Sequence, residues 1–376
     1  LKPILPLLLS MGVPMMISML IQSLYNIVDS IYVSRLGTDA ITAISLVYPL
    51  QNIIMAVSVG VGVGIGSVIS MNLGAGNQEK ADKAASVGMF LTFIHVIIFI
   101  LIGIFVTKPF LQLFTKDAQV LEWACDYGYI VMIVSFGSLI QICFEKIYQS
   151  VGSMMTTMLV LGVSCVINII LDPVFIFGYF GVPAMGVRGA AIATVIGQIA
   201  GMFLYMILYK KRGLAVSVSF KKMRPEAELV RQIYSVGIPS TLMLALPSGL
   251  VSILNAILAG FSEIYVAVLG LFLKLQSFIY MPANGIVQGM RPIIGYNYGA
   301  GEKKRMYKTI RVGLILTAAI MAVGTLAAQL FPQAILSMFD AEPELMDKGV
   351  EALRIISIGF IISSVGVIYC GTFEAL

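Results

Sequence analysis

The sequence predicts an all-α integral membrane protein, and three observations lead to this class. Hydrophobic residues make up 59% of the 376 residues and charged residues only 11%, with a mean hydropathy of +0.97. Such values lie far from those of water-soluble domains. Many apolar runs are long enough to cross a hydrocarbon layer of roughly 30 Å. Two motifs also return at a single offset, which indicates internal duplication.

About ten apolar segments are candidate spans. They are 8–33, 46–70, 86–107, 124–148, 155–179, 187–209, 235–259, 266–292, 309–331 and 350–376. Helices are predicted because a lone segment in lipid must satisfy its backbone hydrogen bonds internally. Barrel strands would be about half as long and would alternate in polarity. The first segment is too long for a cleavable signal peptide and contains Asp29.

The duplication is visible in two short motifs. Ser10–Pro14 returns as Ser235–Pro239, and Asn72–Gly76 returns as Asn297–Gly301, both shifted by 225 residues. In each half the second helix leads into a basic loop, so the halves have the same orientation across the membrane. They are predicted to be parallel repeats, related by an axis along the membrane normal.

The basic residues set the predicted orientation. With a cytoplasmic N-terminus, seventeen of the 24 lysines and arginines lie in inside loops, as the positive-inside rule requires. The protein is therefore expected to be multi-pass in the plasma membrane, a bacterial or archaeal inner membrane. The net charge of +5 reflects this topology and contact with anionic lipid, and a nucleic-acid partner is not expected.

One long polar segment divides the chain. We predict a six-helix bundle over 1–212, a basic cytoplasmic linker over 213–232 and a second bundle over 233–376. The second bundle holds four spans where the repeat calls for six. Two six-helix bundles are therefore expected in the whole protein, with this chain truncated to about ten transmembrane helices.

Two acids lie deep within apolar spans, and they are the first candidates for a functional site. Asp29 and Asp172 would each cost several kcal/mol in lipid unless paired or hydrated. Asn168 lies four residues before Asp172, on the same helix face, and Pro173 leaves the carbonyl of Ile169 without its helical donor. Together these groups could bind a proton or Na⁺. The alternative is that both acids only form interhelical hydrogen bonds.

Other polar or adaptable side chains are candidates for a substrate cavity. They are Gln22, Tyr25, Asn26, Gln51, Gln141, Gln276 and Met281. Gln51 and Gln276 are related by the repeat and could face a central cleft from both halves, although a polar residue near a helix end is an equal alternative. Methionine offers a polarisable surface that suits a polyspecific site, but it is more often core or lipid-facing.

The motifs resemble those of the multidrug and toxic compound extrusion (MATE) transporters. The resemblance rests on Asp29 followed by Arg35-Leu36-Gly37, on the duplicated Asn-x-Gly-Ala-Gly loop, on Asn168 to Pro173 and on Gly189 to Thr194. It implies two six-helix bundles in a V shape and export of amphipathic, often cationic compounds in exchange for Na⁺ or H⁺. It also implies that Asp29, Asn168, Asp172 and Thr194 hold the coupling ion, and that the protein works as a monomer.

Some family members carry acids in the second bundle as their main cation site. Here the seventh span has none, and Glu374 in the tenth aligns through the repeat with Gln149, near the cytoplasmic end. Coupling is therefore expected in the first bundle. An alternative is a flippase for lipid-linked saccharide precursors, which would need a cationic cavity; apart from Lys274, basic residues within the spans are lacking.

The absence of catalytic motifs from the sequence argues against an enzyme. His-Glu-x-x-His and phosphate-loop patterns are missing from the sequence, and the four cysteines lack metal-site spacing. The glycines at 60, 62, 64 and 66 predict close helix packing rather than phosphate binding. No cofactor is expected beyond the coupling ion, and the expected partners are small-molecule drugs and the lipid bilayer.

Overall fold

The computed structural model describes residues 2–337 and 343–376, and no strand occurs among them. The helices are α1 (Ile4–Ser34), α2 (Thr38–Gly74), α3 (Gln78–Gln112), α4 (Ala118–Ile133), α5 (Phe136–Ser150), α6 (Met154–Phe177), α7 (Val187–Arg212), the 3₁₀ turn η1 (Phe220–Lys222), α8 (Ala227–Ala259), α9 (Glu263–Gly299), α10 (Lys303–Leu330), α11 (Pro332–Ser337) and α12 (Pro343–Phe373).

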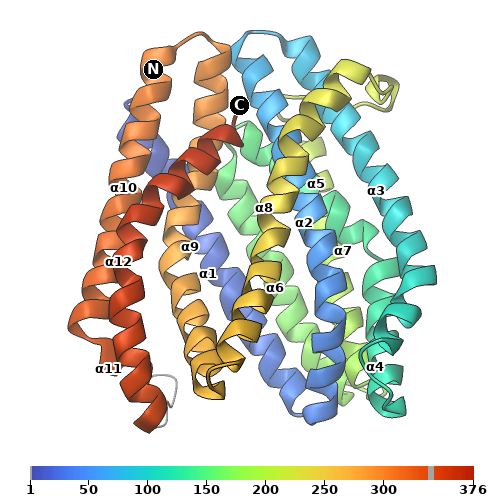
Figure 1. Ribbon diagram of the computed structural model, residues 1–376. Coiled ribbons are helices and arrows are strands. Elements are labelled where there is room, and N and C mark those ends of the chain that lie inside the picture. Colours follow the sequence, from blue (N-terminus) through green and yellow to red (C-terminus); the bar gives the residue numbers. More distant parts are fainter. Residues whose placement is uncertain (1, 338–342) are drawn as a thin grey trace.

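The predicted spans are confirmed. Within the described residues, nine helices are each long and apolar enough to cross a membrane, and α4 and α5, bent by 46° at the break between them, pass the same test as a pair. Each corresponds to one of the ten apolar segments. The long helices run roughly side by side, and both chain ends lie at the same end of the molecule (Figure 1). This end also carries the linker, and we call it the basic end and the opposite one the outer end.

The duplicated Asn-x-Gly-Ala-Gly loop forms the same turn twice at the basic end. The side-chain amide of Asn72 donates to the carbonyl of Val68 at 2.8 Å, and that of Asn297 donates to Ile293 at 2.7 Å. The last glycine of each loop has a positive φ, 74° in the first copy and 73° in the second. Only glycine adopts this backbone conformation without strain. The repeat therefore encodes a specific helix–turn–helix connection.

The two halves exchange their first helices at the basic end. Ile4 and Leu8 of α1 are buried in an apolar cluster built mainly from α9, α10 and α12. Leu229 and Ile233 of α8, each 225 residues further on, are buried in the cluster of α2, α3, α5, α6 and α7. In Figure 1, α2 and α8 cross between the helices of the two halves. Each half thus completes the core of the other.

Glycines of α2 allow α8 to approach closely, as the spacing predicted. A Cβ on Gly60 would lie 2.6 Å from the backbone nitrogen of Thr241, and one on Gly64 would lie 3.1 Å from that of Gly237. Any larger residue would overlap the neighbouring backbone. The alternate glycine Gly62 faces Lys146 of α5 instead, 2.6 Å from its Cγ. The α2 glycines therefore pack against two different helices.

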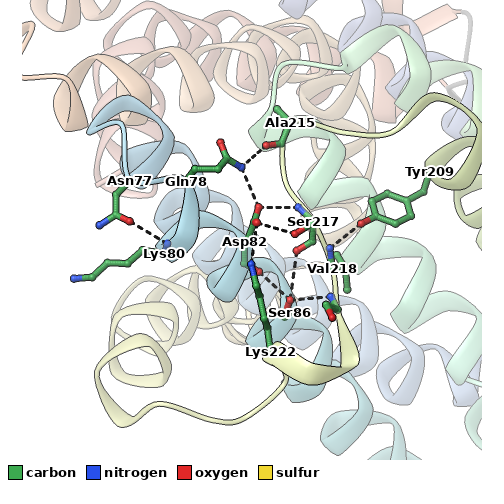
Figure 2. Close-up of polar contacts among 11 residues, drawn as sticks. Asn77, Gln78, Lys80, Asp82, Ser86, Tyr209, Ala215, Ser217, Val218 and Lys222 are labelled. Carbon is green, nitrogen blue, oxygen red and sulfur yellow. Dashed lines mark hydrogen bonds and ion pairs between the residues drawn. The ribbon is translucent and has the colours of Figure 1, made fainter.

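Asp82, near the N-terminal end of α3, binds the segment that follows α7 (Figure 2). The Asp82 carboxylate accepts hydrogen bonds from the backbone and hydroxyl of Ser217, at 2.8 and 2.7 Å, and from Lys222 Nζ at 3.1 Å. Lys83 forms an ion pair with Glu226, immediately before α8. This ion pair lowers the pKa of the Glu226 carboxyl below its ordinary value. The link between the halves is thus held against α3.

Candidate functional site

Small residues bring α7 close to α6, and this contact positions two of the predicted coupling residues. A Cβ on Gly197 would lie 3.0 Å from the carbonyl oxygen of Ser164 and 3.2 Å from the Cβ of Asn168. At this close approach the amide of Asn168 donates to the hydroxyl of Thr194 at 3.4 Å. Both side chains are buried. Asn168 and Thr194, distant in sequence, therefore share one site.

The two intramembrane acids meet beside this pair. Asp172 lies one turn after Asn168 on α6 and is completely buried. Its carboxyl group lies near that of Asp29, on α1, close enough for the charge of one to act on the other. Two ionised carboxylates only accept hydrogen bonds and repel each other. The pair is therefore compatible with burial only when a proton or a cation lies between or beside the two groups.

Two tyrosines complete the polar surroundings. Tyr127 of α4 is buried, its hydroxyl accepts a hydrogen bond from Gln51 of α2 at 3.3 Å, and it lies near both acids. Tyr25, one turn before Asp29 on α1, approaches the hydroxyl of Thr194. Tyr127 is not among the site residues predicted from the sequence. Nothing in its local sequence distinguishes it from Tyr129, because only the packing of α4 decides which ring points inward.

The buried oxygens of this site lack hydrogen-bond donors. Asp29 Oδ1, Asn168 Oδ1 and both carboxylate oxygens of Asp172 are buried without a partner among the described residues. Buried acceptors are normally satisfied, and several orphans in one place call for a bound species. Carboxylate, amide and hydroxyl oxygens suit a hard monovalent cation, and carboxylates also suit a proton. The residues fit either Na⁺ or H⁺.

The remaining cavity candidates are dispersed. Gln22 is half-buried on α1 and Asn26 is exposed there. Gln141 is buried inside the first half, where its amide donates to the Ser164 hydroxyl at 3.5 Å. Gln276 and Met281 lie half-buried on α9, away from the acid pair. Gln51 points to Tyr127 rather than to its repeat partner Gln276.

Charged side chains near the basic end are paired within each half. Lys146 of α5 is buried and donates to Glu145 at 2.9 Å and to Gln149 at 3.1 Å. On the other side, Arg291 of α9 forms an ion pair with Glu374, which follows α12. Residues of both groups line one small cavity of about 30 Å³ between the halves. The buried basic charges described here are therefore neutralised by neighbouring acids.

Comparison with known proteins assigns the chain to a family. The MatE family profile matches residues 14–174 and 239–376, which is most of the chain; the unmatched stretch 175–238 contains α7 and the linker. The multidrug export protein MepA of Staphylococcus saprophyticus is 26% identical over 365 residues, covering 97% of this chain and 80% of that protein. MepA of Staphylococcus haemolyticus is 27% identical over 366 residues, with the same two coverages.

Solved structures share the fold. The outward-facing conformation of a multidrug resistance MATE family transporter superposes with a TM-score of 0.91 at 24% identity, covering all of this chain and 83% of that one. A transporter of the MOP superfamily from Pyrococcus furiosus superposes with a TM-score of 0.89 at 24% identity, covering all of this chain and 84% of that one. The duplicated helices, the two-bundle fold and the matched family profile together make this chain a transporter, not an enzyme, of the MATE family.

Proposed function

We propose that this protein exports amphipathic, often cationic compounds in exchange for Na⁺ or H⁺, which binds at Asp29, Asn168, Asp172 and Thr194. The observation that carries the proposal is the group of buried oxygens without donors at this site. Ion or proton binding neutralises the acids, and loss of the ion restores their repulsion. The MepA relatives, which are named as multidrug export proteins, support the substrate class.

The coupling follows from competition for the same negative charge. When the acids are ionised, the first half offers an attractive site to a cationic drug; when a proton or Na⁺ binds, that attraction is lost and the drug is released. Pro173 of α6 interrupts a helical hydrogen bond next to the site, and Pro14 interrupts one fifteen residues before Asp29 on α1; these are the expected bending points. We place the basic end in the cytoplasm, following the charge bias, and expect a monomer in the plasma membrane.

The flippase alternative has less support. Phosphate-bearing substrates need unpaired positive charge in the cavity, whereas Lys146 and Arg291 are each paired with a glutamate. Lys274 of α9, within a predicted span, is exposed. The arrangement of charge therefore favours a cationic substrate over an anionic one.

The test uses purified protein in liposomes. Efflux of ethidium is driven separately by a Na⁺ gradient and by a pH gradient, for the wild type and for Asp29→Asn and Asp172→Asn. Asp39→Asn, an exposed acid in the first turn of α2, is the matched control. We expect gradient-driven efflux to be lost in the two site variants and retained in the control.

Two other results would contradict the proposal. Unchanged efflux in both site variants would remove the coupling role from this site. Absence of efflux with any cationic compound under either gradient, in folded wild-type protein, would instead favour the flippase. Folding of every variant is checked by its elution volume and melting temperature.

A further inference from the structure

A second cavity opens at the outer end of the first half. Its volume is about 260 Å³, and its walls come from three places: Leu36 just after α1, Glu122, Trp123 and Asp126 on α4, and Met185–Arg188 at the start of α7. None of the coupling residues lines it. The proposed antiport does not require this cavity, so its role is a separate question.

The charge of the cavity is negative. Arg188 binds Asp126 through two parallel hydrogen bonds, from Nε to Oδ2 at 2.6 Å and from Nη2 to Oδ1 at 2.8 Å. This geometry satisfies both groups and removes their net charge. Glu122 lies one turn before Asp126 on α4, is exposed, and takes part in no ion pair among the described residues. The wall thus holds two carboxylates, Glu122 and Asp126, against the one guanidinium of Arg188, which leaves a net charge of −1.

The rest of the wall suits the body of an organic ion. Trp123 is the only tryptophan of the chain, and an indole ring attracts cations over its face more strongly than other aromatic rings. Leu36, Met185 and Val187 add apolar surface. A bare metal ion would instead need a cage of oxygens. At about 260 Å³ the space lies slightly below the range of drug-sized sites, which favours a small ligand.

We propose that this cavity binds small organic cations of the quaternary ammonium type, with Glu122 supplying the charge and Trp123 the aromatic face. Two of the elements that form it also carry coupling residues: Leu36 follows Asp29 of α1 by seven residues, and Val187 precedes Thr194 of α7 by seven. Two helical turns correspond to about 10 Å. The cavity therefore lies at the outer end of the same helices, within reach of cations on that side.

The single tryptophan provides the readout. Purified protein in lipid nanodiscs is excited selectively at tryptophan and titrated with tetraethylammonium chloride, with NaCl keeping the ionic strength constant. We expect a saturable change in Trp123 emission. Glu122→Gln weakens the apparent affinity about five-fold, the equivalent of losing one exposed charge contact, whereas Glu122→Asp retains most of it. Glu79→Gln, which removes an exposed acid at the start of α3, leaves the affinity unchanged.

Three results would overturn the proposal. They are the absence of a saturable emission change, the same change produced by NaCl alone, and equal tetraethylammonium affinities for the wild type and Glu122→Gln. Because Glu122 is exposed, the variants are expected to fold, and their elution volumes verify this. The experiment involves no transport, so its outcome is independent of the ethidium assay and of the proposed antiport.

Discussion

Gly74 and Gly299, related by the 225-residue repeat, make the same contact with each other's half. The Cα of Gly74 packs against the backbone of Tyr296, and that of Gly299 packs against the backbone of Met71, which is itself the repeat partner of Tyr296. The two contacts are therefore related by an approximate twofold axis, as in a symmetric dimer. This pair of glycines closes the basic end of the boundary between the halves.

Alanine at either glycine is expected to force the halves apart at the basic end. A Cβ there would overlap backbone atoms that have no rotamer to change, at a cost of about 1–3 kcal/mol. Gly74→Ala and Gly299→Ala should each lower the melting temperature and reduce ethidium efflux. Gly366→Ala is the control, since a Cβ at Gly366 meets no atom within 4 Å. Equal melting temperatures for all three variants would contradict the twofold contact.

Tyr127→Phe is expected to weaken coupling with little effect on the fold. The variant removes the hydroxyl that accepts from Gln51 beside the acid pair, and leaves a half-buried amide without that partner, at about 1 kcal/mol. The concentration of Na⁺ or H⁺ that gives half-maximal efflux should rise several-fold. Tyr129→Phe, two residues away on α4 and half-buried, is the matched control. A similar shift in both variants would argue against a specific role for Tyr127.

Asp82→Ala is expected to release the link between the halves. The carboxylate holds Ser217 and Lys222 through charge-assisted hydrogen bonds, whose loss costs about 1.5–3 kcal/mol. Trypsin should therefore cut within residues 212–231 at least about ten times faster, measured by mass spectrometry of the fragments. Asp39→Ala, an exposed acid on α2, should leave the cleavage rate unchanged.

A second contact between the linker and α3, the ion pair of Glu226 with Lys83, should weaken only well below neutral pH. Because the ion pair with Lys83 lowers the pKa of Glu226 below 4.5, its contribution is present above that value and is lost as the pH falls through the lowered pKa. Hydrogen exchange of the linker amides, corrected for intrinsic rates, should thus stay constant between pH 7 and pH 5. Increasing exposure over that interval would contradict the attachment.

Removing one partner of the Arg291–Glu374 ion pair is expected to destabilise the protein more than removing both partners. Both side chains are largely buried, with exposed fractions of 22% and 12%. Glu374→Met alone leaves an uncompensated cation, at a cost of about 3 kcal/mol, whereas Arg291→Met with Glu374→Met should recover most of the melting temperature. A double variant no more stable than the single one would show that the pair itself stabilises the boundary.

Much of this protein follows directly from its sequence. Nine of the predicted spans are confirmed as single helices long and apolar enough to cross a membrane, and the tenth as the bent pair α4 and α5, because apolar length is read directly from the sequence. The family assignment agrees with the motifs at Asp29 and from Asn168 to Pro173. Asn168 and Asp172 could be placed on one helix face from their spacing. These inferences depend only on neighbours in the chain, so the sequence carries them without a structure.

The tertiary structure decided which distant side chains meet. Tyr127 lies at the acid site and Gln51 donates a hydrogen bond to it. Neither position could be predicted from the sequence, because packing against other helices sets the rotation of α2 and α4 about their axes. The exchange of α1 and α8 between the halves likewise depends on glycines that allow backbones to touch. Within a span nearly every residue is apolar, so hydropathy does not distinguish the face toward lipid from the face toward protein, and only the packed helices do.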